Sequence, residues 1–129
     1  MVTVDDVRAL ALRLPRSYEV VVRGRLKFRV GRIVYLAFSK DQTIMGFGFP
    51  KEWRNVVLES EPHKFLPPDP VDVRYQWLQV RLSAIDEDEM RDLVLDAWRM
   101  VVPKSVAASL RLSAESGIGD LVEAEVDQV

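Results

Sequence analysis

The sequence contains no cysteine and only one histidine, His63. Without thiols the chain can form no disulfide, hold no thiolate zinc site and use no cysteine nucleophile. His63 stands beside Lys64 in a proline-rich stretch, and no neighbouring pattern supplies the third group that orients a catalytic base. We therefore expect a protein that is not an enzyme and that needs no metal or other cofactor.

Long apolar segments are also missing. No run of hydrophobic residues approaches the roughly 20 that span a bilayer. The N-terminal residues lack a basic stretch followed by an apolar one, which is the pattern of a secretory signal. Together with the lack of cysteine, these features lead us to expect a cytoplasmic protein with no membrane partner.

The net charge is small, −2, but it is unevenly distributed. Residues 113–129 contain five of the 20 acidic residues and no lysine or arginine. The rest of the chain then has 18 basic against 15 acidic residues, a net charge of +3. We expect one domain over residues 1–112, followed by an acidic and flexible tail over residues 113–129.

Hydrophobic periodicity and turn residues predict an α+β fold. Thr3 and Asp6 form a helix-capping pattern, and Pro15 ends the helix that follows. We expect residues 18–22 to be an extended lead-in to the first strand. The predicted elements in chain order are a helix to residue 14, strands at 25–30, 33–38 and 43–49, a short helix after Pro50, a loop at 61–70, strands at 71–75 and 77–82, and helices at 86–101 and 104–112. This order indicates an antiparallel sheet with helices packed mainly on one face.

The most informative feature is a segment in which basic and apolar residues alternate. Because side chains alternate across a strand, its basic residues should share one face and its apolar residues the other. The basic residues are Arg23, Arg25, Lys27 and Arg29, with Arg32 in the adjoining Gly31-Arg32 turn, and the apolar residues are Leu26, Phe28 and Val30. Such a hairpin could contact successive phosphates of DNA or another polyanion without reading sequence. The alternative is a solvated face neutralised by Glu19, Asp41 or the acidic tail.

The three tryptophans differ in their expected surroundings. Trp53 is expected to pack its short helix against the sheet, and Trp98 is expected to lie in the core. Trp77 shares an outward face with Gln79 and Arg81, where it could serve as a base-stacking platform. The alternative, which we favour on the general burial of large aromatics, is that the last helix or a partner subunit covers Trp77.

Gly46 and Gly48 lie ahead of the helix expected after Pro50 and weakly suggest a phosphate-binding turn. The third glycine of that motif is missing, and hairpins rather than a βαβ unit connect the strands. We therefore expect the two glycines to relieve crowding where another segment crosses the sheet.

Three segments of the chain resemble the MmcQ/YjbR family. They are VDDVRALALRLP at 4–15, LKFRVGRIVYLAF at 26–38, and the Trp77–Leu82 strand with DEDEMRDLVLDAWRMVV at 86–102. The family consists of small bacterial α+β domains described as DNA-binding proteins with a double-wing arrangement. The resemblance implies an α-β(3)-α-β(2)-α sandwich, in agreement with the order predicted above, and a DNA-binding function.

We therefore expect a domain that binds nucleic acid weakly through its basic hairpin. The residues expected to bind are Arg23, Arg25, Lys27, Arg29 and Arg32, with Trp77 and Arg81 extending the surface. The alternative is a protein-interaction or dimerisation domain, because the same sandwich occurs in chaperone-like proteins that hold acidic or amphipathic segments. Its cationic face would then grip an acidic partner, including the tail of another copy.

Overall fold

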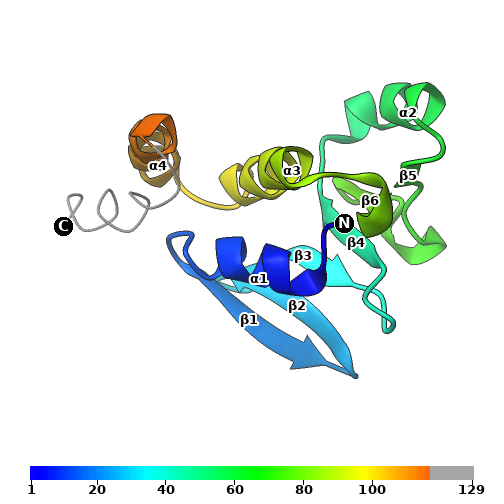
Figure 1. Cartoon of the computed structure of the whole chain (residues 1–129), viewed down its shortest axis with the longest axis horizontal. Coiled ribbons are helices and arrows are strands. Elements are labelled where there is room, and N and C mark those ends of the chain that lie inside the picture. The colour runs from blue at the N-terminus through cyan, green and yellow to red at the C-terminus, as the bar shows by residue number, and fades with distance from the viewer. Residues whose placement is uncertain (117–129) are drawn as a thin grey trace.

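The computed structural model describes residues 1–116, with the side chains of residues 1–110. The helices and strands are α1 (Val4–Ala11), β1 (Ser17–Val22), β2 (Arg25–Val30), β3 (Ile33–Phe38), β4 (Ile44–Gly48), α2 (Lys51–Ser60), β5 (Phe65–Leu66), β6 (Trp77–Arg81), α3 (Glu87–Arg99) and α4 (Lys104–Ser116) (Figure 1). Short 3₁₀ turns at Pro70–Asp72 and Leu82–Ala84 flank β6. Most of the expected acidic tail, residues 117–129, lies outside the described residues.

The strands form one antiparallel sheet in the order β1-β2-β3-β4-β6-β5. Helices α1 and α3 contact each other, and α3 packs on β3 and β4, while α2 lies near β5 at the other end of the sheet (Figure 1). The expected α+β fold, an antiparallel sheet with its helices mainly on one face, is confirmed. Within residues 1–116, no helix combines the length and apolar composition needed to cross a membrane.

The core forms between the sheet and the helices α1 and α3. Leu26, Phe28 and Val30 of β2 all face it, as their alternation predicted. The rings of Phe28 and Phe38 meet edge to face with centroids 6.2 Å apart. Trp98 of α3 is fully buried, and its indole N–H donates to the carbonyl of Pro15 at 2.9 Å. This bond ties α3 to the end of the first helical segment, so the core position expected for Trp98 is confirmed.

The helix starts follow the predicted capping chemistry. The hydroxyl of Thr3 accepts from the Asp6 backbone N–H, and the Asp6 carboxylate accepts in return from the Thr3 N–H. Asp86 caps α3 by accepting from the Glu89 N–H at 2.8 Å. Both contacts satisfy backbone donors that a helix leaves unpaired in its first turn.

Residues 18–22 are not an unpaired lead-in but a full strand, β1, which pairs with β2 along its whole length. A two-residue turn connects them, in which Arg23 and Gly24 both have positive φ, 53° and 79°. That is the pattern of a type I′ hairpin turn, whose twist suits antiparallel strands. Arg23 therefore lies in the turn and not on the strand face where we expected it.

Two other expectations were wrong in detail. Residues 71–75 form turns rather than a strand, and the short strand beside β6 is Phe65–Leu66 instead. Trp53 does not pack on the sheet, because its side chain on α2 is 59% exposed.

Candidate functional site

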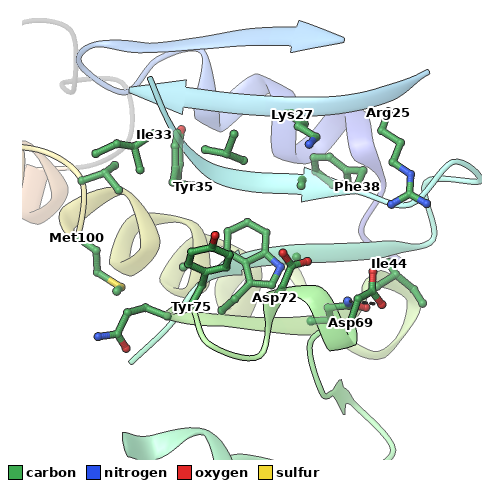
Figure 2. Close-up of a pocket in the computed structure, with 18 of the residues that line it drawn as sticks. Arg25, Lys27, Ile33, Tyr35, Phe38, Ile44, Asp69, Asp72, Tyr75 and Met100 are labelled. Atoms are coloured by element: carbon green, nitrogen blue, oxygen red, sulfur yellow. Dashed lines mark hydrogen bonds between the residues drawn. The ribbon is translucent and has the colours of Figure 1, made fainter. Parts of the chain in front are cut away.

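The face of the sheet opposite α1 and α3 is hollow in its middle. Paired residues there form a row across four strands, in the order Lys27, Ala37, Gly46 and Gln79. The two central members have little or no side chain. Together with the segment that precedes β6, the hollow makes an open groove of about 920 Å³ (Figure 2).

One wall of the groove is cationic. Arg25 and Lys27 of β2 point into it (Figure 2). Arg32 in the β2–β3 turn lines it as well. Within the described part of the chain, none of the three forms an ion pair. We call these three residues the cationic wall.

In the alternative interpretation, Glu19, Asp41 or the acidic tail would neutralise this wall, but both of these carboxylates are engaged elsewhere. Glu19 pairs with Arg8, whose Nε lies 3.3 Å from the Glu19 carboxylate. Asp41 accepts from the hydroxyls of Ser39 and Thr43 at 2.8 Å, which lowers the pKa of its carboxyl. The third group named in that alternative, the acidic tail, falls largely outside the described residues. The described carboxylates thus leave the cationic wall open to a ligand.

The opposite wall is acidic. Asp69 and Asp72 lie in the segment between β5 and β6 and face the groove across from β2 (Figure 2). Asp69 accepts one hydrogen bond from the Gln79 amide at 3.3 Å. Neither carboxylate is ion-paired with a described residue. We call these two residues the acidic wall.

The floor between the walls is aromatic. Trp77 is half-buried, and its indole lies against the backbone of Gly46, so that a Cβ at Gly46 would come within 2.7 Å of the indole Nε1. Gly46 therefore provides the space that Trp77 occupies. Trp77 was expected to be either an exposed stacking platform or covered by another element. It is partly both, because it packs on the sheet and still lines the groove. Tyr75, 51% exposed, and Met100 lie at the same side of the groove (Figure 2).

Helix α2 fixes the segment that supplies the acidic wall and the aromatic residues. The Arg54 guanidinium donates to the carbonyls of Val73, Tyr75 and Trp77 at 2.9–3.1 Å. Lys51 adds two more bonds, from its ammonium to the Arg74 carbonyl at 2.8 Å and from its backbone N–H to the Gln76 side chain at 2.6 Å. Five hydrogen bonds thus hold this segment, although it has little regular structure of its own.

Tyr35 is the most deeply buried polar side chain among the groove residues. Its hydroxyl lies 2.6 Å from the Ser17 hydroxyl, and the residue is fully inaccessible to solvent. Burial raises the pKa of Tyr35 to about 12, against the smaller opposing effect of the Ser17 hydrogen bond. Tyr35 is therefore neutral at physiological pH and adds no charge to the groove.

The structure brings together four of the seven residues expected from the sequence to bind. Arg25, Lys27, Arg32 and Trp77 line the groove, whereas Arg23, Arg29 and Arg81 do not. Arg29 pairs with Val34 beyond a bulge in the ladder, and its Nε is buried without a hydrogen-bond partner among the described residues. His63 is exposed and also lies outside the groove.

The acidic wall and Tyr75 were not anticipated. They belong to a proline-rich segment whose residues have no periodicity, so the sequence offered no direction for their side chains. One available signal was the grouping of two aspartates and two aromatic residues within residues 69–77.

Comparison with known proteins gives a family match and a structural match. A family model described as YjbR matches residues 12–100. The crystal structure of Deinococcus radiodurans protein DR2400, which has a DUF419 domain, is similar with a TM-score of 0.69 and 21% sequence identity over 80% of each chain. At that identity the likeness concerns the fold alone. None of the curated proteins matches the chain.

Proposed function

The chain belongs to the YjbR family, and we propose that it is a non-enzymatic domain that binds nucleic acid through the cationic wall of its groove. Arg25, Lys27 and Arg32 would neutralise phosphates and thereby position the nucleic acid without reading its sequence. The observation behind this proposal is that the three cations share one open surface and have no ion-pair partner among the described residues.

The fold supports the proposal by keeping these cations apart from the core. Arg25 and Lys27 alternate along β2 with the buried residues Leu26 and Phe28, so their side chains cannot turn inward. Both remain on the sheet face that α1 and α3 leave uncovered. A rigid strand with charges at fixed intervals suits a backbone of regularly spaced phosphates.

Salt dependence gives the first test. If three phosphates are neutralised, the logarithm of the binding constant should fall against the logarithm of salt concentration with a slope of about −2.7 for duplex DNA and about −2.1 for a single strand. The measurement is fluorescence anisotropy of a labelled oligonucleotide between 50 and 200 mM salt. A slope near zero for bound nucleic acid would contradict the proposed phosphate contacts.

A pair of matched variants gives the second test. The double variant R25E/K27E reverses two charges of the cationic wall. R13E/K104E changes the net charge by the same amount at two exposed positions outside the groove. We expect R25E/K27E to lose measurable binding and R13E/K104E to retain most of it. Equal losses in the two variants would mean that binding follows net charge and not this wall.

One observation favours a second candidate function, self-association. Strand β1 forms an edge of the sheet, and its residue Val21 is 65% exposed to solvent. Exposed edge strands are templates for pairing with another chain, and the cationic wall of one copy could grip the acidic tail of another. Deleting residues 117–129 separates the two functions, because it should strengthen nucleic-acid binding under the first and weaken self-association, measured by sedimentation, under the second.

A further inference from the structure

The groove presents unpaired charges of both signs on facing walls. Arg25 and Lys27 point into it from β2, and Asp69 and Asp72 face them from the segment before β6 (Figure 2). The two sets do not reach each other, since no ion pair joins them. A phosphate backbone lying along the groove would satisfy one wall and be repelled by the other. The complementary occupant is a molecule with an anionic end and an end that donates hydrogen bonds.

Between the walls the groove suits a flat ring. The Trp77 indole rests on Gly46, where no side chain intervenes, and Tyr75 also lines the groove. Stacking on an aromatic side chain is the usual way in which proteins hold an unstacked base. At about 920 Å³, the groove is within the range of sites for small ligands.

We propose that the groove binds a single unstacked nucleotide whose base has an amino group. Its phosphate would lie against Arg25 and Lys27, and its base would stack on Trp77. The exocyclic amino group of cytosine, adenine or guanine would donate to Asp69 or Asp72. Uracil and thymine present a carbonyl at the position of the cytosine amino group and would be disfavoured. This inference rests on the proposed function and refines it from backbone contacts to one nucleotide.

The backbone of the acidic wall is held by two turns, in which the Asp72 N–H donates to the Asp69 carbonyl at 2.8 Å and the Tyr75 N–H donates to the Asp72 carbonyl at 2.9 Å, and the residues that follow are held by α2. The three Arg54 hydrogen bonds hold the carbonyls on both sides of Tyr75, and Lys51 holds the adjoining residues. Little ordering is then needed when a ligand enters, which favours binding of a small molecule. The same chemistry is present in a free nucleotide and in a single strand, and the experiment below distinguishes these two sources.

The probes are two matched pairs: CMP against UMP, and the octamers dC₈ against dT₈. Within each pair the bases differ at C4, which has an amino or a carbonyl group, and at N3, which accepts in cytosine and donates in uracil and thymine. CMP and UMP control for the methyl group, which only dT₈ carries. Binding of the mononucleotides to the full chain is followed by NMR of its three tryptophan indole N–H groups. We expect the Trp77 resonance to shift with CMP, while that of Trp98, bonded to Pro15 in the core, stays in place as an internal control. Binding of the octamers is measured by anisotropy.

Variants separate the parts of the site. The wild-type chain should prefer the cytosine member of each pair by about tenfold, which is the scale of one good base contact. D69N/D72N should reduce that preference below about twofold. W77A should weaken both members of a pair by about tenfold, with W77F retaining part of the affinity. R25E/K27E should weaken both members as well. Circular dichroism verifies that each variant is folded.

The outcomes distinguish this inference from the proposed function. A Trp77 shift with CMP and a cytosine preference that D69N/D72N removes would support the inference. If R25E/K27E weakens octamer binding, but dC₈ and dT₈ bind equally well and W77A and D69N/D72N leave the affinity unchanged, the inference is overturned and the proposed function stands. If CMP binds as described but dC₈ binds no more tightly, the ligand is a free nucleotide and the proposed function fails. If neither CMP nor dC₈ binds, both are overturned.

Discussion

Replacing Gly46 by alanine tests whether the Trp77 indole occupies the floor of the groove. A Cβ at Gly46 would lie 2.7, 2.8 and 2.9 Å from three atoms of the indole, closer than real Cβ atoms approach their neighbours. The strand backbone at Gly46 is held by β3 on one side and β6 on the other, so the indole must move. We therefore expect G46A to displace Trp77 from its packed position.

The magnitude follows from how freely Trp77 can respond. Overpacking a well-filled site costs about 1–3 kcal/mol. Because Trp77 is only half-buried and borders an open groove, part of the strain is relieved by rotation, and we expect about 1–2 kcal/mol at the lower end of that range. A valine, with two further methyl groups, should cost more.

Gly48 provides the matched control. It lies on the same strand, but the atoms nearest to a Cβ there would be the Met100 sulfur at 3.6 Å and Ala97 atoms at 3.7–3.8 Å, which are ordinary contacts. Neither glycine has a positive φ. G48A should therefore be neutral or stabilise the fold by up to about 1 kcal/mol, by restricting the unfolded chain.

Chemical denaturation measures the free energy of unfolding of both variants, and tryptophan fluorescence or the Trp77 indole resonance reports the position of the ring. G46A should lower stability and change the Trp77 signal, whereas G48A should do neither. If G46A is as stable as G48A and leaves the Trp77 signal unchanged, the packing of Trp77 on Gly46 is wrong, and the stacking platform proposed for the groove loses its basis.

Three further predictions concern stability. R23N should stabilise the protein by about 0.5–1 kcal/mol, because asparagine adopts the positive φ of a type I′ turn more readily than arginine does. The control R32N changes a turn position without positive φ and should give no gain in the same denaturation assay. K64M should lower the free energy of unfolding by about 1–2 kcal/mol, because the Lys64 ammonium lies 2.7 Å from the Glu61 carboxylate and 2.6 Å from that of Glu89. The control K40M, at an exposed position, should change it little. Because burial raises the pKa of Tyr35 from 10.0 to about 12, the free energy of unfolding should be unaffected by this group below pH 10 and should fall by about 3 kcal/mol as the pH rises towards 12. Y35F, which has no hydroxyl to ionise, should lose less stability over that pH range. Parallel stability curves for the two proteins would refute this account.

The parts of the fold that the sequence predicted well are those with a local cause. The bounds of β2 and β3 match the predicted 25–30 and 33–38, because alternation marks β2, a continuous apolar and aromatic run marks β3, and Gly31 marks the turn between them. The start of α1 follows from the Thr3 and Asp6 side chains, each of which accepts from the other's backbone N–H. These features depend on residues a few positions apart and can be deduced without a tertiary structure.

The features that escaped prediction depend on distant contacts. β1 is valine-rich without clear alternation, and Arg23-Gly24 lacks the asparagine or aspartate that usually announces a type I′ turn. β5 has only two residues and exists through its pairing with β6. The segment that leads from the acidic wall into β6 is held by Arg54 on α2, whose bond to the Val73 carbonyl spans 19 residues of the chain. No local pattern connects an arginine on one helix with the carbonyls of a later loop.

The electrostatics of β2 lead to a last prediction, about a conflict between stability and binding. Lys27 lies between Arg25 and Arg29 on the strand, with Cα atoms spaced about 7 Å along it. At that separation a like-charge pair near water costs about 0.5 kcal/mol, reduced by salt. K27E turns two repulsive pairs into attractive ones, a change of about 1 kcal/mol for each pair, and should stabilise the domain by about 2 kcal/mol at low salt and by less as salt is added. The same change should abolish binding of a phosphate to the cationic wall. A gain in stability together with a loss of binding would mean that the cations serve a ligand at the expense of the fold, while a K27E variant that is less stable would show that Lys27 has a structural role.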